Sequence, residues 1–232
     1  MKHSTITVEG VQPADNFVVE YPSSAVSSGI YARFGKRIFD LMISIVAAPV
    51  LVPVIAILWF VVRRDGGPGM FVQERVGKDG KVFRCYKLRT MVMDAEKVLE
   101  DMCASDPVVA HEWKVNQKLK HDPRITKVGK FLRETSLDEL PQFFNVVRGE
   151  MSFVGPRPFL PSQKADYDQA GGRAYYDVRP GVTGLWQVEG RGETSFVGRV
   201  GFDETYGEKH SLRYDIGLMF KTVAVVLKKT GH

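Results

Sequence analysis

The longest run of apolar positions lies near the N-terminus, where residues 41–62 read LMISIVAAPVLVPVIAILWFVV without a charged side chain. As a straight helix this segment would be about 33 Å long, close to the hydrocarbon thickness of a bilayer. Ser44 is its only polar residue, whereas a helix packed on a soluble core shows a polar stripe toward solvent. The pattern therefore favours a membrane helix over a buried core helix.

Two prolines and the flanking charges bear on how this segment meets the membrane. Pro49 and Pro53 each remove a backbone hydrogen bond and clash with the preceding turn, so we expect a bend between the two halves. A single crossing would carry a basic excess at one end only, but this segment has basic residues at both. They are Arg33, Lys36 and Arg37 before it, and Arg63 and Arg64 after it. We predict a re-entrant helix over residues 31–65 that enters and leaves one leaflet, with a single crossing as the alternative.

Shorter patterns predict the remaining elements. Residues 63–89 interleave basic and aromatic side chains around a GKDGK turn at 77–81, which is typical of a β-hairpin. Helical periodicity runs from residue 94 to 107, continues to 120, and returns from 126 to 144, before proline and glycine loops begin beyond 152. Near the C-terminus, apolar residues recur at helical spacing: Ile216, Met219, Phe220, Val223 and Leu227. This spacing fits a core helix and an interfacial amphipathic helix equally well.

The chain divides into three parts. Residues 1–30 contain five serines and no leucine or long apolar run, so we expect a flexible tail rather than an export signal. The re-entrant helix follows at 31–65, and the length of 232 residues leaves one folded domain at 66–232. The expected fold class is α/β, mainly helical with a small β-hairpin, in a monotopic membrane protein with interfacial amphipathic helices.

Composition narrows the choice of partners. The 32 basic and 27 acidic residues leave a net charge of +5, which suits anionic lipid, nucleotides or nucleic acid. Eight of the basic residues fall between 63 and 89, and beside a membrane segment such a belt favours anionic lipid head groups over nucleic acid. Two cysteines, Cys85 and Cys103, argue against a disulfide framework or a zinc cluster and fit a reducing compartment.

Two adjacent acidic residues are the best candidates for catalytic residues. The chain has no GxxxxGK[ST], HExxH or CxxC motif, but Asp138 and Glu139 stand together in RETSLDELP at 133–141. Ser136 and Glu139 also match a helix capping box, which would be a purely structural role. The two interpretations are compatible, because a carboxylate at a helix N-terminus has a depressed pKa and lies where backbone N–H groups receive phosphate. An ionised aspartate can attack phosphorus, and Glu139 could bind Mg²⁺ together with phosphate oxygens.

The order of several motifs resembles the bacterial sugar transferase family. These motifs are KRIFD (36–40), the proline-broken apolar segment, YKLRTM (86–91), SLDELPQFFNVVRGEMSFVGPRP (136–158) and VRPGVTGLWQVEGR (178–191). The resemblance spans about residues 33–230 and implies a polyprenyl-phosphate sugar-1-phosphate transferase on the cytoplasmic face of the bacterial inner membrane. One departure is Ala48-Pro49, where some relatives carry Ser-Pro, so we expect another group, such as Ser44, to bind the backbone that the proline frees.

The resemblance also implies a mechanism. Asp138 matches the family's nucleophile and Glu139 the residue that holds Mg²⁺. Asp138 would attack the sugar-bearing phosphorus of a UDP-sugar and expel UMP, and undecaprenyl phosphate would then take the sugar phosphate from the aspartate. The donor would be UDP-galactose or UDP-glucose, and the product would begin exopolysaccharide synthesis in the cytoplasmic catalytic domain, 66–232.

Such chemistry requires cations around a diphosphate. The candidates are Lys87, Arg133, Arg157, Arg179 and Arg191, with Gln187 and Trp186 as further contacts to the nucleotide or sugar and Asp203 as a more remote acid. Arg157 is the strongest arginine, because prolines flank it and the resemblance places its loop beside the acidic pair. Lone arginines elsewhere more often pair with surface acids.

Two other functions compete with the transferase. A membrane-anchored adaptor would use the basic belt for binding and the acids only as helix caps. A metal-dependent glycosyltransferase would move the sugar alone and release UDP instead of UMP. The sequence does not specify the sugar, and it leaves open whether the chain forms a homodimer.

Overall fold

The computed structural model describes residues 29–116, 119–190 and 194–227, so residues 1–28 of the predicted tail and Arg191 lie outside the described residues. The described part is mainly helical, with two small pairs of strands. The α-helices are α1 (Lys36–Arg63), α2 (Ala95–Ser105), α3 (Pro107–Asn116), α4 (Lys127–Glu134), α5 (Gln142–Arg148), α6 (Lys164–Gln169), α7 (Ala174–Asp177), α8 (Val200–Lys209) and α9 (Leu212–Leu227). The strands are β1 (Met70–Val76), β2 (Val82–Leu88), β3 (Ser152–Val154) and β4 (Gly181–Thr183).

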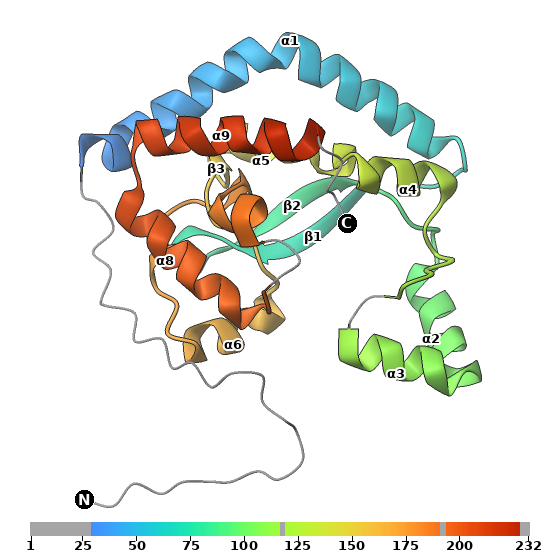
Figure 1. Ribbon diagram of the computed structural model, residues 1–232. Coiled ribbons are helices and arrows are strands. Elements are labelled where there is room, and N and C mark those ends of the chain that lie inside the picture. Colours follow the sequence, from blue (N-terminus) through green and yellow to red (C-terminus); the bar gives the residue numbers. More distant parts are fainter. Residues whose placement is uncertain (1–28, 117–118, 191–193, 228–232) are drawn as a thin grey trace, which may run out of the picture.

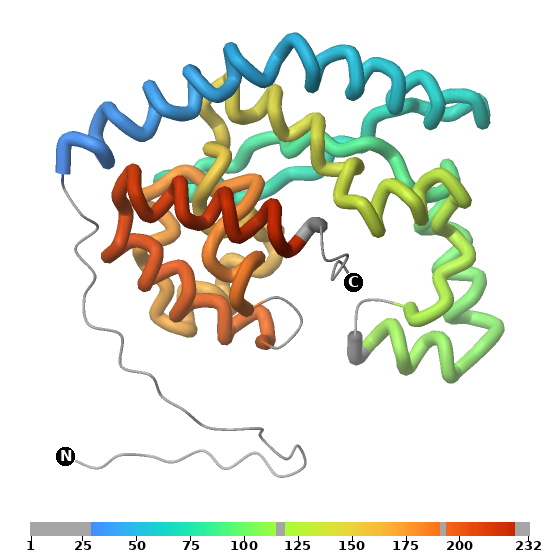
Figure 2. Tube along the Cα trace, turned by 45° about the horizontal axis from the view of Figure 1, so that its top comes forward, coloured from blue at the N-terminus to red at the C-terminus, as the bar shows by residue number. Residues whose placement is uncertain are grey.

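Helix α1 follows a short π-helical turn at Tyr31–Gly35 and arches over one side of the molecule (Figure 1). It bends near its middle, where Pro49 and Pro53 lie inside the helix (Figure 2). Most of its apolar side chains are exposed, and residues 31–63 form a helix long and apolar enough to cross a membrane. The predicted role of Ser44 is wrong, because its Oγ donates to the carbonyl of Asp40, 2.8 Å away, and not to a carbonyl that a proline frees.

The N-terminal end of α1 is attached to the folded body by charged side chains. Lys36 Nζ lies 2.6 Å from Asp215 Oδ2 on α9, and both side chains are buried. Asp40 accepts hydrogen bonds from Ser152 Oγ at 2.9 Å and from the Phe153 N–H at 3.1 Å on β3. Arg37 donates to two carbonyls of the last turn of α5.

The C-terminal end of α1 is attached to the same body. Arg89, just beyond β2, donates to the carbonyls of Val62, Pro68 and Met91 and forms an ion pair with Asp65. A small apolar cluster lies beside this junction, where Val62 packs with Leu88 and Leu132. Both ends of α1 are therefore attached to the same folded body.

The predicted β-hairpin is confirmed. Strands β1 and β2 pair in antiparallel register, with Gln73 opposite Cys85, and a tight turn at Lys78–Gly80 joins them. The basic belt is dispersed by this fold, because three of its members turn into the protein. Arg75 donates to Gln73 and to the Pro158 carbonyl, Lys87 bonds to Glu139, and Arg89 holds the end of α1.

The prediction of a continuous helix over residues 126–144 is wrong. Helix α4 ends at Glu134, and a separate helix, α5, begins at Gln142. Between them Ser136 has φ 56°, a left-handed conformation that a serine rarely adopts and that ends the α-helix. The acidic pair lies in this interruption, on a single 3-10 turn at Leu137–Glu139.

The C-terminal half contains more regular structure than its proline and glycine content indicates. Strands β3 and β4 pair in parallel, and the apolar core beside them includes Val154, Val178, Leu185, Tyr206 and Leu218. Strands of three residues leave no alternating pattern in a sequence. Helix α9 runs along the same side of the molecule as α1 (Figure 1). It buries Leu218 but exposes Ile216, Phe220 and Val223, as expected for an interfacial helix.

Candidate active site

A cleft of about 1150 Å³ contains the acidic pair. Its walls come from β1, the end of β2 with the segment that follows, the pair α2 and α3, and the turn after α4. Four of the predicted site residues line it together with Asp138: Lys87, Arg133, Glu139 and Arg157. Residues more than 70 positions apart in the sequence thus meet at one cleft.

The backbone of Ser136 sets the position of the pair. Because Ser136 is left-handed, the chain turns sharply after α4 and presents Asp138 and Glu139 on the short 3-10 turn. Ser136 makes no side-chain cap, so the predicted capping box is wrong. Leu137 packs beside Val62 and Leu132, which places this turn close to the C-terminal end of α1.

Glu139 is held between two cations. Its Oε1 accepts hydrogen bonds from Lys87 Nζ at 2.7 Å and from Arg157 Nη2 at 2.9 Å. Burial alone would raise the pKa of Glu139, but the charges of Arg157 and Lys87 outweigh it and hold that pKa well below its usual range. The same carboxylate raises the pKa of Arg157. Glu139 is therefore ionised throughout the physiological pH range.

Asp138 has a different environment from its neighbour. No hydrogen bond from the described residues reaches its carboxylate, and burial raises its pKa, partly opposed by the charge of Lys87. The depressed pKa expected from a helix N-terminus is thus wrong, because the turn is too short to supply a helix dipole and desolvation dominates. An unpartnered, partly desolvated carboxylate beside several cations is a suitable nucleophile once it is ionised.

The two cations that hold Glu139 are themselves fixed by the fold. Lys87 extends from β2, whose pairing with β1 sets its direction. Arg157 lies in the GPRP loop, and its carbonyl accepts a hydrogen bond from Arg199. Asp203 forms an ion pair with Arg199 at 3.4 Å and is fully buried, which raises its pKa to about 6. Asp203 thus supports the Arg157 loop from behind and does not line the cleft.

Arg133 reaches the cleft from α4. Its Nε donates to Thr90 Oγ1, 2.8 Å away within the YKLRTM motif. The helix can approach this segment because Gly129 has no side chain: a Cβ there would lie 2.0 Å from the Thr90 carbonyl oxygen. Three of the positive side chains that line the cleft, Lys87, Arg133 and Arg157, lower the pKa of Asp138.

Comparison with known proteins gives the family of this chain. The family model described as bacterial sugar transferase matches residues 31–229, nearly all of the described chain. This chain belongs to the bacterial sugar transferase family.

Three relatives show how much of each chain the similarity covers. The UDP-galactose-lipid carrier transferase of Erwinia amylovora is 51% identical over 86% of this chain, but the match covers 42% of that relative. The undecaprenyl-phosphate galactose phosphotransferase of Salmonella typhimurium is 48% identical with the same coverage. The exopolysaccharide production protein ExoY of Sinorhizobium fredii is 43% identical over 84% of this chain and 87% of its own length. The chain thus spans less than half of the first two relatives and most of the third.

The described members of the remaining predicted site residues do not line the cleft. Arg179 Nε donates to the Gly149 carbonyl at 2.8 Å, which joins two loops. Gln187 is buried, and its Nε2 and Oε1 find no hydrogen-bond partner among the described residues. Trp186 stacks near Arg199 and donates to Thr194 Oγ1. Arg191 falls in a gap of the described chain.

Several residues of the cleft were not predicted from the sequence. Thr90 anchors Arg133, and Gln73 lines the cleft while accepting a hydrogen bond from Arg75. Arg124, paired with Asp122 at 2.7 Å, lies beside the Trp113 ring and forms part of the α2–α3 wall. The direction of Gln73 and Lys87 was available from the alternation of the hairpin, whereas the α2–α3 wall depends on a tertiary contact.

The site fits Mg²⁺ bound jointly with a substrate. The described residues contain no cluster of three or more His, Cys, Asp or Glu side chains that would hold a metal alone. Mg²⁺ usually takes one or two carboxylates and completes its shell with phosphate oxygens and water. The second oxygen of Glu139, which accepts no hydrogen bond from the described part of the chain, can supply one such carboxylate ligand.

Proposed function

We propose that this sugar transferase moves a sugar 1-phosphate from a UDP-sugar to undecaprenyl phosphate, giving undecaprenyl-diphosphate-sugar and UMP. The printed names of two relatives specify transfer to a lipid carrier or to undecaprenyl phosphate, and that of a third specifies exopolysaccharide production. UDP-galactose is the first candidate donor, because two of these relatives are named for galactose, and UDP-glucose is the second. The product would serve as the first lipid-linked intermediate of exopolysaccharide synthesis.

The observation that carries the proposal is the difference between the two acids. Glu139 already has two cationic partners, whereas Asp138 has no direct partner and lines the cleft beside the same cations. A carboxylate in that position can approach a phosphorus whose negative oxygens contact Arg133 and Arg157. Asp138 is therefore the proposed nucleophile, and Glu139 the residue that orients Lys87 and Arg157.

The transfer would take place in two displacements at the same phosphorus. An Asp138 carboxylate oxygen attacks the sugar-bearing phosphorus, the bond from that phosphorus to the bridging oxygen breaks, and UMP leaves with the electron pair. An oxygen of undecaprenyl phosphate then attacks the sugar-phosphoryl aspartate, and the bond from phosphorus to Asp138 breaks to restore the carboxylate. Each displacement develops negative charge that Lys87, Arg133 and Arg157 are placed to stabilise. When bound through Glu139, Mg²⁺ would neutralise part of the diphosphate charge.

The proposed location is the cytoplasmic surface of the bacterial inner membrane. The two ends of α1 are attached to the same folded body through Lys36 and Arg89, which supports a re-entrant helix over a single crossing. The dyad turn packs through Leu137 against the cluster at the end of α1. The reacting carboxylate would thus lie near the depth of lipid phosphates, where undecaprenyl phosphate presents its own phosphate.

Trapping the covalent intermediate tests the proposal. The full chain in detergent is incubated with Mg²⁺ and UDP-galactose or UDP-glucose without acceptor, and the digested peptide is analysed by mass spectrometry. We expect a sugar-phosphate mass on Asp138 and release of UMP. Asp138→Asn should lose both, whereas the matched control Glu134→Gln, an exposed acid on α4 outside the cleft, should keep them.

The same experiment separates the competing functions. Release of UDP instead of UMP would indicate a glycosyltransferase that moves the sugar alone. An adaptor would release neither nucleotide from any variant. A phosphosugar on a residue other than Asp138 would reject the proposed nucleophile.

A further inference from the structure

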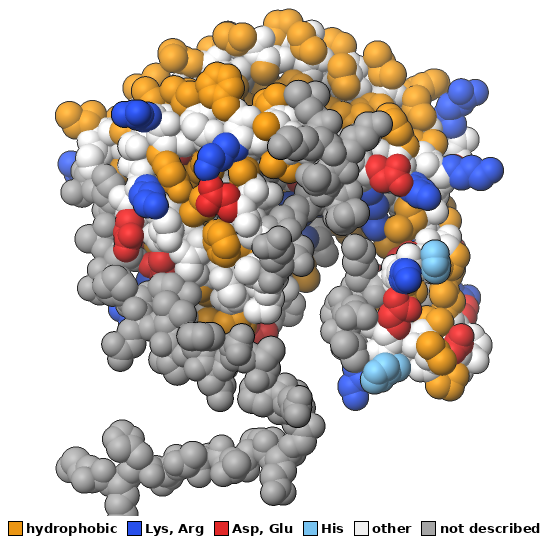
Figure 3. Space-filling view, viewed as in Figure 1, with side chains coloured by type: hydrophobic (Ala, Val, Ile, Leu, Met, Phe, Trp, Pro, Cys, Tyr) orange, Lys and Arg blue, Asp and Glu red, His pale blue; other side chains and the backbone are white. Residues whose placement is uncertain are grey.

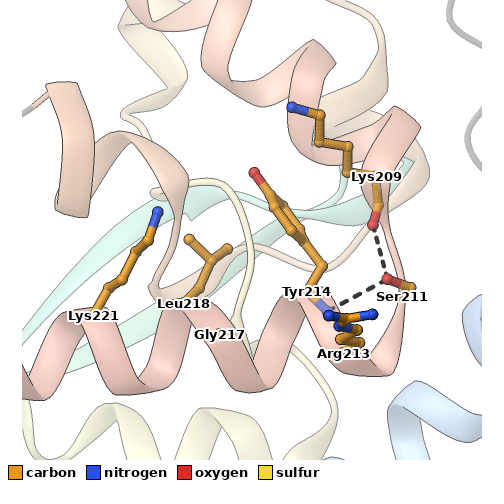
Figure 4. Close-up of a pocket in the computed structure, with 7 residues that line it drawn as sticks. All are labelled: Lys209, Ser211, Arg213, Tyr214, Gly217, Leu218 and Lys221. Atoms are coloured by element: carbon orange, nitrogen blue, oxygen red, sulfur yellow. Dashed lines mark hydrogen bonds between the residues drawn. The ribbon is translucent and has the colours of Figure 1, made fainter.

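A second pocket lies between the end of α8 and the first half of α9, apart from the cleft. It encloses about 420 Å³, within the range of small-ligand pockets, and none of its lining residues lines the cleft. Figure 4 shows its lining: Lys209, Ser211, Arg213, Tyr214, Gly217, Leu218 and Lys221. Nothing in the proposed transfer reaction uses these residues.

The charges around the pocket leave it positive. The lining contains three basic side chains and no carboxylate. Lys221 Nζ is paired with Glu189 Oε1 at 2.6 Å, from outside the lining. Asp215, although on the same helix, is fully buried and bonded to Lys36, Tyr31 and Tyr206. Among the described residues no ion pair engages Lys209 or Arg213, so two cations remain for a ligand.

The position of the pocket on α9 indicates where that ligand comes from. Arg213, Gly217 and Lys221 are four residues apart and form one stripe of the helix, and exposed Ile216 and Phe220 form the adjacent stripe. Figure 3 shows that basic side chains on this face lie directly beside the broad apolar surface of the molecule. An apolar stripe flanked by cations is the pattern of a helix at the membrane interface, with its cations at the depth of lipid phosphates.

The floor and the opening of the pocket suit a polar head group. Leu218 is 1% exposed and closes the base. A Cβ added at Gly217 would meet no atom within 4 Å, so the space beside the helix is open there. Tyr214 adds a hydroxyl group that can bond to glycerol or phosphate oxygens, whereas the Ser211 hydroxyl already donates to the Lys209 carbonyl. Phe220, 73% exposed, precedes the lining residue Lys221 on α9 and offers an apolar side chain to acyl chains.

We propose that this pocket binds the head group of an anionic phospholipid, with Lys209 and Arg213 on its phosphate and its acyl chains along Ile216 and Phe220. The bound lipid would fix the depth and orientation of the protein at the membrane surface. This site is independent of the sugar-phosphate chemistry, so its failure and that of the proposed function are distinguishable.

Native mass spectrometry of the full chain in neutral detergent, titrated with phosphatidylglycerol, tests the proposal. Phosphatidylcholine, inorganic phosphate and glycerol 3-phosphate serve as the comparison ligands. We expect phosphatidylglycerol to bind most tightly, and the double variant Lys209→Gln/Arg213→Gln to bind it about thirtyfold more weakly. The matched control is Lys114→Gln/Arg173→Gln, which removes the same two charges from exposed positions outside both pockets.

A second variant separates the pocket from the surface charge. Gly217→Leu keeps every charge, favours the helix and fills the open space, so it should also lose phosphatidylglycerol binding. UMP release in lipid-free detergent should be the same in all these variants. Equal weakening in the control, full binding by either pocket variant, or equally tight binding of inorganic phosphate would each overturn the proposal.

Discussion

Asp138 and Glu139 are consecutive residues whose surroundings move their pKa values in opposite directions. Burial raises the pKa of Asp138, while the charges of Arg157 and Lys87 lower that of Glu139 despite its burial. Such a separation commonly marks two acids with different chemical roles. The difference supports the proposed roles, in which Asp138 attacks phosphorus and Glu139 holds Lys87 and Arg157.

The raised pKa of Asp138 leads to a prediction about pH. Only the ionised carboxylate attacks phosphorus, so the rate of adduct formation should fall as the pH drops through a pKa above the ordinary value of 3.8. Lys87 is the leading charge that lowers this pKa, so Lys87→Met should move the acidic limb of the profile to higher pH. Single-turnover UMP release measured across pH gives the position of the limb independently of its height.

A matched lysine on the same hairpin provides the control. Lys81 lies at the far end of the hairpin, and its side chain is 82% exposed. Lys81→Met should leave the acidic limb where it is in the wild type. A limb that stays fixed or moves to lower pH in Lys87→Met would show that Asp138 is not the titrating nucleophile.

Arg157 and Arg179 should differ sharply when each is replaced by lysine. Arg157 bonds to Glu139 and lines the cleft, and lysine would keep its charge but lose the forked donor geometry suited to phosphate. We expect Arg157→Lys to lower kcat/KM for the UDP-sugar by about 10²-fold. Arg179 bonds to the Gly149 carbonyl away from the cleft, so Arg179→Lys should change kcat/KM little. Steady-state assays decide this, and an equal loss in both variants would place Arg179 in the site as well.

At the residue scale, the two acids and three cations of the cleft could be predicted from the sequence. Asp138, Glu139, Lys87 and Arg157 lie in family motifs, and Arg133 lies just before the acids. The left-handed Ser136 could not, since serine carries no sequence signal for that backbone conformation. The same conformation explains why the capping box failed. Arg179 and Gln187 lie in another motif, VRPGVTGLWQVEGR, and neither lines the cleft, because a motif records sequence order rather than the position of a side chain.

Among the elements, α1 is the one whose attachment depends most on buried charge. Its Lys36 pairs with Asp215, and the two side chains are 7% and 0% exposed. Removing one member leaves the other charged and buried, so Lys36→Met should lower the free energy of unfolding by about 3 kcal/mol. Denaturant unfolding of the full chain in detergent measures this loss.

An exposed ion pair of similar length is the control for that prediction. Lys164 and Asp168 on α6 lie 2.5 Å apart, but their side chains are 47% and 43% exposed. Lys164→Met should therefore change the free energy of unfolding by less than about 0.5 kcal/mol. Similar losses in Lys36→Met and Lys164→Met would contradict a special role for the buried pair.

Some secondary-structure elements can be predicted from their local sequence and others cannot. The bend of α1 and the β-hairpin follow from Pro49, Pro53 and the GKDGK turn, which act locally. Strands β3 and β4 have three residues each and depend on a pairing between Ser152 and Gly181 that no local pattern encodes. The motif KRIFD can be identified in the sequence. Its structural role cannot, because Lys36 and Asp40 bond to residues more than 100 positions away.

On the scale of the whole molecule, the attachments of α1 constrain its path through a membrane. Residues 41–62 are long enough to cross, about 33 Å as straight helix. A crossing would carry one end of α1 to the opposite surface and break either the Lys36–Asp215 pair or the contacts of Arg89 with Val62 and Asp65. Each break would leave charged groups buried without partners, and this cost supports the proposed re-entrant path.

Labelling in the bacterial inner membrane tests this path. In a Cys103→Ser background, where the remaining Cys85 is 2% exposed, single cysteines are introduced by Gly29→Cys before α1 and by Glu74→Cys on β1 after it. Because both attachments hold the ends of α1 against one body, both cysteines should react with an impermeant maleimide in inverted vesicles, and neither should react in spheroplasts. The background without an added cysteine reports any reaction at Cys85. Reaction of Gly29→Cys in spheroplasts, with Glu74→Cys still protected, would establish a crossing and would require that one of the buried attachments opens in the membrane.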